Sequence, residues 1–185
     1  ATMTVAPGAE SAEIRIYVAC LAAYNGGRLH GAWISAEQDA DGIQADVDAM
    51  LAASPEPSAE EWAIHDSEGF HGMTIDESES FEHVAELAEV LSEHGAAYAA
   101  YADVVGEHYA NVGGFEDAYR GEWDSEEAYA IDYIESTGVL DSMPDNLRHY
   151  FDWAAWTRDL FMDYVSADSP SGRRGYSGVY VFECN

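Results

Sequence analysis

Basic residues are missing from the middle of this chain. From Leu29 to Tyr119 there are 91 residues without lysine or arginine, and 21 of them are aspartate or glutamate. The whole chain has no lysine and sets seven arginines against 36 acidic residues, which gives a formal net charge of -29. Solubility needs only about 2 to 8 units of net charge on a domain of this size. Because self-repulsion destabilises a compact fold, so many acids indicate a role beyond solubility.

Two interpretations of this charge stay open at the level of composition. In the first, the protein imitates a polyanion: duplex DNA has one charge per about 1.7 Å of axis, so the 29 charges correspond to about 49 Å of duplex. In the second, the protein is a salt-adapted (halophilic) binding or enzyme domain whose acids serve solvation in brine. A disordered acidic chain is disfavoured, because 48% of the residues are hydrophobic and 12% are aromatic.

The length of 185 residues suits one domain or a row of smaller units. No apolar run approaches the roughly 18 residues of a membrane span, and Ala1 to Glu13 lacks the basic and apolar segments of a signal peptide. We therefore expect a cytoplasmic protein with a flexible N-terminal tail, residues 1–12, and no membrane partner. Cys20 and Cys184 have neither a metal-binding nor a redox spacing and are expected to stay reduced.

The first unit, residues 13–75, is expected to be a small antiparallel sheet with one helix. Glu13 to Cys20 alternates with the period of two that is typical of a half-buried strand. A helix is predicted from Asp41, because apolar residues recur at i, i+4, i+7 and i+8 from Ile43. The other expected elements are a turn at Tyr24 to Gly27, a strand at Arg28 to Ser35, a helix end at Ser54 to Pro57, a strand at Glu60 to Asp66 and a loop at Gly69 to Gly72.

The middle unit, residues 76–113, is expected to be helical. Ser80 is a typical N-cap for a helix whose apolar residues recur at helical spacing, and Gly95 is expected to end that helix. A second helix, Ala96 to Ala110, is expected to follow it. The pair Gly113-Gly114 then breaks the pattern.

The first of these two helices has a ladder of carboxylates. Four glutamates fall on one face at axial steps of roughly 5 to 6 Å: Glu82, Glu86, Glu89 and Glu93. Like charges at i and i+4 destabilise an isolated helix by about 0.2 to 0.5 kcal/mol a pair, and no lysine lies between them. An ordinary solvated face explains why these positions are polar but not why they have a single sign. We therefore interpret them as a functional surface.

The last unit, residues 114–185, is expected to combine helices with a small sheet. Asp124 to Glu127 has the D-x-x-E form of a capping box ahead of a helix at Ala128 to Ser136. The remaining expected elements are one long or two short helices in Pro144 to Met162 and a hairpin that pairs Val165 to Ala167 with Gly178 to Glu183.

Patterns of catalysis and metal binding are weak in this sequence. His65 to His71 contains four potential metal ligands in seven residues, but the spacing fits neither the H-E-x-x-H helix nor a thiolate–histidine zinc site, so no metal is expected. There is no nucleophile elbow, C-x-x-C pair, phosphate-binding glycine loop or basic patch. We predict no enzyme activity, no catalytic residue and no cofactor. Arg148 and Arg158 lie among aspartates and are expected to form ion pairs within the chain.

Further motifs occur in a fixed order along the chain. They are Ile16-Tyr17-Val18-Ala19, Tyr24-Asn25-Gly26-Gly27-Arg28-Leu29-His30-Gly31-Ala32-Trp33-Ile34, Glu61-Trp62-Ala63-Ile64-His65-Asp66 with the following Phe70, Phe115-Glu116-Asp117-Ala118-Tyr119-Arg120-Gly121, Tyr150-Phe151-Asp152-Trp153 and Arg158-Asp159-Leu160. Together they resemble the ArdA-type antirestriction proteins over about Ile14 to Phe182. The resemblance is specific as a set, although no single motif would establish it.

The resemblance implies a DNA mimic of mobile genetic elements that occupies the DNA-binding groove of Type I restriction-modification enzymes, chiefly their methyltransferase core. It also implies an α+β fold in which three small units form an elongated chain. Two such chains would form a curved homodimer through their C-terminal units. Surface acids would replace phosphates, so no direct nucleic-acid partner is expected. The antirestriction region of the family would fall around Tyr129 to Asp159.

Two surfaces are predicted on this basis. The DNA-mimic surface would consist of Glu82, Glu86, Glu89, Glu93, Asp66, Glu68, Asp76, Glu77, Glu79, Asp103 and Glu107. The dimer contact would include Phe115, Tyr119, Tyr150 and Trp153, which can equally belong to the core. The sequence departs from the pattern of the family in its N-terminal tail and in an insert at 169–175 that contains Arg173-Arg174.

Overall fold

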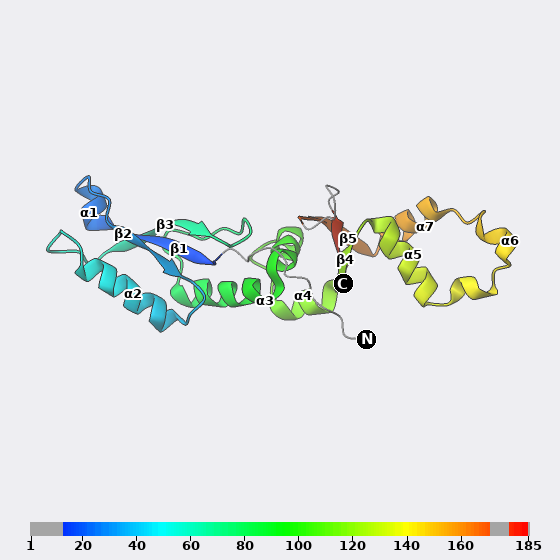
Figure 1. Ribbon diagram of the computed structural model, residues 1–185, viewed down its shortest axis with the longest axis horizontal. Helices are drawn as coiled ribbons and strands as arrows, with labels where there is room; N and C mark the ends of the chain where they lie inside the picture. The colour runs from blue at the N-terminus through cyan, green and yellow to red at the C-terminus, as the bar shows by residue number, and fades with distance from the viewer. Residues whose placement is uncertain (1–12, 171–177, 185) are drawn as a thin grey trace. The chain divides into compact units, whose positions relative to one another are not determined.

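The computed structural model describes residues 13–170 and 178–184. Within them the chain forms seven α-helices, one 3-10 helix and two three-stranded antiparallel sheets (Figure 1). The expected α+β class with small antiparallel sheets is thus confirmed. Contacts divide the chain into two compact units, residues 1–95 and 96–185, here called unit 1 and unit 2. The finer division into three units stays a prediction, and the predicted tail at 1–12 lies outside the described residues.

Unit 1 has its core between a sheet and two helices. Alternate residues of the first strand, among them Ile16 and Val18, are fully buried, as the period of two predicts. Ile43 and Val47 of the following long helix are also fully buried and face the sheet. The elements of unit 1 are β1 (Arg15–Cys20), α1 (Leu21–Asn25), β2 (Gly31–Ser35), α2 (Ala40–Ala52), β3 (Trp62–Glu68) and the first part of α3 (Phe81–Val105), with sheet order β2-β1-β3.

The structure differs from the expected elements of unit 1 at the first turn. The turn predicted at Tyr24 to Gly27 is half helical, because α1 extends to Asn25; only Gly26 and Gly27 follow it, and Gly27 has a φ of 76° that favours glycine. Arg28 N–H donates to the carbonyl of Ala23 at 2.9 Å. Because Arg28 is thereby bonded to α1, the second strand begins at Gly31 and not at Arg28. An intervening helix of one turn has too few residues to show a helical period.

α3 contains a break at Gly95, where φ is 57° and ψ is -143°. At its start, the Ser80 hydroxyl accepts a hydrogen bond from His83 N–H at 3.2 Å, which confirms the predicted N-cap. The prediction of two successive helices that meet at Gly95 is therefore confirmed. The second helix ends at Val105 and not at Ala110, because the chain turns at Gly106, whose φ is 92°.

Unit 2 combines the second part of α3 with a sheet and several short helices. Its core contains an aromatic cluster in which Phe115 contacts Tyr98 and Tyr101 at ring-centroid distances of 5.6 and 5.7 Å. A second buried group consists of Tyr129, Ala130, Leu160 and Val181. The other elements are α4 (Val112–Ala118), β4 (Tyr119–Trp123), α5 (Glu126–Ser136), the 3-10 helix η1 (Val139–Ser142), α6 (Asp145–Arg148), α7 (Trp153–Leu160), β5 (Tyr164–Ser169) and β6 (Gly178–Glu183), with sheet order β4-β6-β5.

Two local predictions in unit 2 were wrong. Gly113-Gly114 does not break the chain but lies in the first turn of α4, because Asn111 caps that helix and accepts from Gly114 N–H at 2.8 Å. A Cβ at Gly114 would lie 2.6 Å from the Tyr101 hydroxyl, so glycine permits close packing at this position. The N-cap of α5 is Ser125 and not Asp124, since the Ser125 hydroxyl accepts from Ala128 N–H at 3.1 Å.

Two further predictions in unit 2 are confirmed, whereas α4, β4 and η1 were not predicted from the sequence. Pro144 to Met162 contains two short helices, α6 and α7, one of the two alternatives that the pattern left open. The predicted hairpin is present: β5 and β6 pair antiparallel from Tyr164 opposite Glu183 to Ser169 opposite Gly178. Most of the insert at 169–175 lies outside the described residues.

Candidate functional site

The four glutamates of the predicted ladder are all exposed on the first part of α3. The opposite face of this helix, with Phe81, Val84 and Leu91, is buried against unit 1. Phe81 stacks on Trp62 of β3 at a centroid distance of 4.4 Å and thereby fixes the start of the helix on the sheet. Because the core contact determines the rotation of the helix, it also determines which way the ladder faces. We call Glu82, Glu86, Glu89 and Glu93 the carboxylate ladder.

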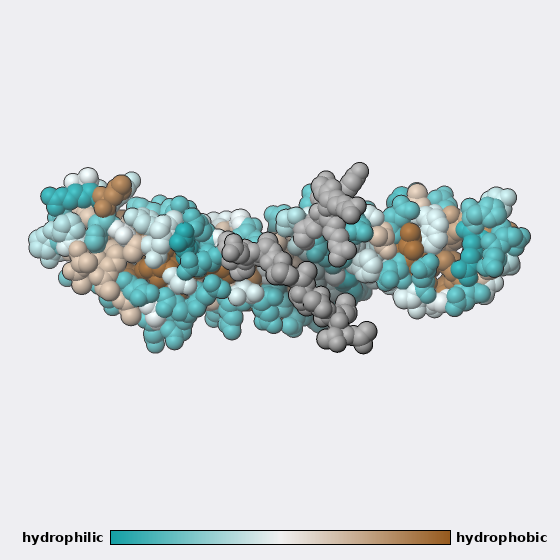
Figure 2. Space-filling model, viewed as in Figure 1, coloured by the Kyte–Doolittle hydropathy of each residue, from teal (hydrophilic) through white to brown (hydrophobic). Residues whose placement is uncertain are grey.

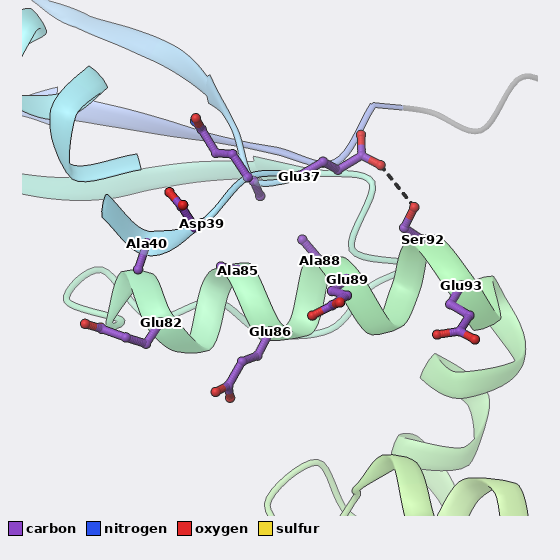
Figure 3. A pocket seen from close by; sticks show the side chains of 12 residues that line it. Glu37, Asp39, Ala40, Glu82, Ala85, Glu86, Ala88, Glu89, Ser92 and Glu93 are labelled. Atoms are coloured by element: carbon purple, nitrogen blue, oxygen red, sulfur yellow. Dashed lines mark hydrogen bonds between the residues drawn. The ribbon is translucent and has the colours of Figure 1, made fainter. Parts of the chain in front are cut away.

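A groove of about 690 Å³ lies between the ladder and the loop that precedes α2. In Figure 3, Ala85 and Ala88 face this loop, whereas Glu86 points away from it. The Ser92 hydroxyl donates a hydrogen bond to Glu37 at 3.2 Å and so joins helix and loop. We call this cavity the acidic groove; its lining residues are Ala36, Glu37, Gln38, Asp39, Ala40, Glu82, Ala85, Glu86, Ala88, Glu89, Ser92 and Glu93.

The loop side of the groove is held by polar contacts with α2. Asp39 is the N-cap of α2 and accepts from Gly42 N–H at 2.7 Å. The Gln38 side-chain amide donates to the Ser35 carbonyl and to Asp46, each at 2.9 Å. A Cβ at Gly42 would lie 2.6 Å from the Gln38 side-chain oxygen, so a larger residue at position 42 would require the Gln38 side chain to shift. Glu37 and Asp39 are therefore placed by local structure.

All the charged side chains that line the acidic groove are carboxylates. At the end of the ladder, His94 Nε2 lies 4.0 Å from Glu93, an ion pair only when this histidine is protonated. Hydrophilic residues also cover most of the described face of the molecule in Figure 2. The groove thus has apolar alanines on its floor and negative charge along both edges, an arrangement suited to long cationic side chains with aliphatic stems.

The other acids of the predicted DNA-mimic surface do not all add equally to its exposed negative charge. Glu68 is largely neutralised, because Arg15 lies 2.7 Å from its carboxylate and also donates from Nε at 2.8 Å. Glu79 is half-buried and accepts from the adjacent Ser80 N–H at 3.3 Å. The remaining members are exposed: Asp66, Asp76 and Glu77 in unit 1, and Asp103 and Glu107 in unit 2.

Sequence reasoning missed Glu37 and Asp39, which face the ladder across the groove. The position of Asp39 ahead of an apolar-periodic helix is a cap signal that the sequence does contain. No sequence signal, however, relates residues 37–39 to residues 82–93, since only the packing of α2 and α3 on the same sheet brings them together. The groove could therefore not be found before the fold was known.

The histidine-rich segment His65 to His71 does not gather into a ligand set. His65 is the extra residue of a β-bulge, because Tyr17 pairs with Asp66 while Val18 pairs with Ile64. Its ring packs edge-on against Tyr24 at 4.9 Å. Within residues 13–170 and 178–184, no group of three or more His, Cys, Asp or Glu side chains could hold a metal ion.

The predicted dimer-contact residues occupy different environments. Phe115 is 3% exposed in the aromatic core of its own chain and stacks on the half-buried Tyr119 at 4.9 Å. Trp153 is half-buried against Phe151. Tyr150, in contrast, is 77% exposed and is the one of the four with a largely free surface. Membership of a dimer interface stays a prediction for all four.

Each of the five arginines in the described part of the chain has a carboxylate partner within the chain. Arg148 lies 3.5 Å from Asp145 and Arg158 lies 3.1 Å from Asp159, which confirms the expected ion pairs. The other three pairs are Arg15 with Glu68, Arg28 with Glu56 and Arg120 with Glu183. The positive charges are thus compensated locally, and the excess of acids is left to the surface.

Taken with the fold, these features define a class: an acidic α+β protein that presents carboxylates of one sign on helices and loops anchored to small sheets. The chain belongs to the ArdA family, because the family model described as "Antirestriction protein (ArdA)" matches residues 16–172, most of its length. This family consists of inhibitors of restriction-modification enzymes, so membership implies antirestriction activity. A comparison with curated protein sequences gave no match. Across residues 13–170 and 178–184, no helix is both long and apolar enough to cross a membrane.

Proposed function

We propose that this protein is a cytoplasmic DNA mimic that occupies the DNA-binding cleft of a Type I restriction-modification enzyme, at its methyltransferase core. The observation that supports this most directly is the acidic groove with its carboxylate ladder, in which every charged side chain is a carboxylate placed by α3 or by the loop ahead of α2. A cleft that binds DNA presents lysines and arginines to phosphates. The same side chains would bind these carboxylates, so that the inhibitor and DNA exclude each other.

The density of charge along the groove is close to that of one DNA strand. The ladder alone spans about 16.5 Å from Glu82 to Glu93, or roughly one charge per 5 Å. With Glu37 and Asp39 included, six carboxylates share this length, about one per 3 Å. Duplex DNA has one charge per about 1.7 Å, and each single strand one per about 3.4 Å. One groove therefore resembles a single strand of the duplex in charge density.

We further propose that the chain acts as an elongated, curved homodimer of three-unit chains, held by the C-terminal third. Three apolar side chains at one end of unit 2 are exposed, namely Val139, Leu147 and Tyr150. Burial of these side chains against a second copy would remove apolar surface from water. Two chains have a formal charge of -58, twice the -29 of one, which corresponds to about 99 Å of duplex.

Competition with DNA tests the proposal. We would measure binding of the chain to a purified Type I methyltransferase by fluorescence anisotropy, with and without a duplex that contains the recognition sequence. The expected result is mutual exclusion, together with an affinity that falls steeply as salt rises, because many ionic contacts are lost together. A ternary complex of methyltransferase, duplex and inhibitor would refute the proposed mechanism. Binding with little dependence on salt would do the same.

A further inference from the structure

The acidic groove belongs to the function already proposed, but the break in α3 does not. At Gly95 the backbone has φ 57° and ψ -143°, while the chain is helical on both sides. Residues that carry a Cβ almost never adopt this conformation, whereas glycine does. A Cβ at Gly95 would meet nothing within 4 Å, so glycine is present for its backbone freedom and not for space.

The break coincides with the boundary between the two compact units, since unit 1 ends at Gly95 and unit 2 begins at Ala96. Each half of α3 is anchored within its own unit. Phe81 in the first half stacks on Trp62, and Tyr98 in the second half packs edge-on against Phe115. The described backbone between these anchors therefore includes a residue that can change conformation while both cores stay intact.

The sequence of α3 is also compatible with a helix that has no break. The spacing of three and four residues that is typical of a buried stripe continues through position 95 and into the second half, as seen at Phe81, Val84, Ala88, Leu91, Gly95, Tyr98 and Ala102. Rotation of the backbone at Gly95 into the helical region would make α3 a continuous helix. The interrupted form of α3 thus differs from a continuous helix in the backbone of one residue.

We propose that Gly95 is a hinge: α3 exchanges between the interrupted form and a continuous helix, and this exchange changes the placement of unit 2 relative to unit 1. The inference concerns the chain itself and holds whether or not the DNA-mimic function is correct. For a protein that presents acids on both units, the hinge would allow the charged surface to adapt to its partner.

Distances between spin labels test the hinge. Cys184 is exposed and Cys20 is buried, so the native Cys184 takes one label and Ala45→Cys on the exposed side of α2 takes the other. Excess unlabelled chain removes distances between copies. We expect a broad or two-peaked distribution in the otherwise unchanged chain. In Gly95→Ala the interrupted form is disfavoured, so one narrow peak from the continuous helix is expected.

Two glycine variants serve as matched controls. Gly72→Ala also places a methyl group at positive φ in open space, but in a loop of unit 1 away from the hinge. Gly113→Ala adds a methyl group to α4, where the helix imposes no positive φ. Both should retain the distance distribution of the parent chain. Inhibition of a Type I enzyme should fall about tenfold in Gly95→Ala alone, within the usual range of coupling between two conformations.

The outcomes separate the hinge from the proposed function. A single narrow distance in the parent chain that does not change in Gly95→Ala would overturn the hinge, whatever the inhibition data show. If the distances behave as expected but no variant, including the parent, inhibits a Type I enzyme, the hinge stands and the proposed function fails. If Gly95→Ala does not fold, the distribution in the parent chain decides, since one narrow peak there refutes exchange.

Discussion

Asp39 has two roles, one in the stability of α2 and one in the charge of the acidic groove. Its carboxylate accepts from Gly42 N–H and caps α2, and the same side chain adds negative charge to the edge of the acidic groove. Asparagine would retain the cap but not the charge, whereas alanine would lose both. The residue therefore allows stability and binding to be measured separately.

We expect Asp39→Ala to lower the free energy of unfolding by about 1 kcal/mol, because the orphan N–H groups of α2 lose their acceptor. Asp39→Asn should retain nearly all of that stability. Urea denaturation followed by circular dichroism measures both variants. If the two variants bind the methyltransferase equally less well than the parent, charge and not capping explains the loss. Equal stability of Ala and Asn variants would contradict the assigned cap.

Tyr129 is expected to make the stability of unit 2 depend on pH. Burial, and then the hydrogen bond with Tyr164, raise the pKa of its hydroxyl well above the ordinary value of 10.0. The folded state thus holds a proton that the unfolded chain releases above pH 10. Stability from this group is complete below about pH 10 and declines as pH rises further, by about 1.4 kcal/mol per pH unit.

The prediction is a drop in unfolding free energy between pH 10 and 11.5 that is smaller in Tyr129→Phe. Urea midpoints measured across this range give the slope. Tyr150→Phe is the control, because Tyr150 is 77% exposed and its removal should leave the slope unchanged. The same slope in all three proteins would show that ionisation of Tyr129 is not coupled to folding.

At the scale of elements, the first half of α3 has one face for the core and one for charge. The sequence predicted both faces, because apolar and acidic residues separate cleanly at helical spacing. It also predicted the Ser80 cap and the break at Gly95. It failed at two short elements: α1 has only one turn, and the glycines of α4 lie in the first turn of a helix that Asn111 caps.

Replacement of the whole carboxylate ladder tests whether the charged face of α3 is needed for inhibition. Exchange of its four glutamates for glutamine changes the net charge from -29 to -25, the sum of -29 and 4. We expect inhibition of a Type I enzyme to fall about 10- to 100-fold, while each single exchange does little, since the field is distributed. Thermal stability should stay equal or rise slightly, because repulsion at i and i+4 is removed.

A control with the same change in charge isolates the position of the acids. It combines four exposed acids of unit 1 outside the groove: Asp41→Asn, Asp48→Asn, Glu60→Gln and Glu61→Gln. This variant should retain most of the inhibition. An equal loss in both fourfold variants would mean that only net charge matters. A single exchange that abolishes inhibition without unfolding would indicate a discrete site.

At the scale of the molecule, the balance of charge decides between the two interpretations of the composition. The five described arginines are already paired with carboxylates, so the net charge of -29 is largely a property of the surface. A salt-adapted protein would need concentrated salt to fold and would have no affinity for DNA-binding proteins. A DNA mimic must fold, and bind its target, at ordinary ionic strength.

We expect the chain to stay folded in dilute buffer, with a melting temperature that rises modestly as salt screens its self-repulsion. A melting curve at low salt, followed by circular dichroism, is the measurement. Unfolding in dilute buffer that is reversed only by molar salt would favour the halophilic alternative. Salt should have the opposite effect on binding: it should weaken the complex with the methyltransferase while it stabilises the folded chain.

The strand order of the second sheet has a consequence for biosynthesis. β6 lies between β4 and β5 in space but follows both in the chain, so neither has its hydrogen-bonded neighbour until Gly178 to Glu183 has been made. Unit 1, whose strands all precede Phe81, can fold while the ribosome is still translating. Unit 2 can complete its sheet only after Gly178 to Glu183 has been translated. A message cut short before the codon for Gly178 would thus yield a finished first unit attached to an unfinished second one.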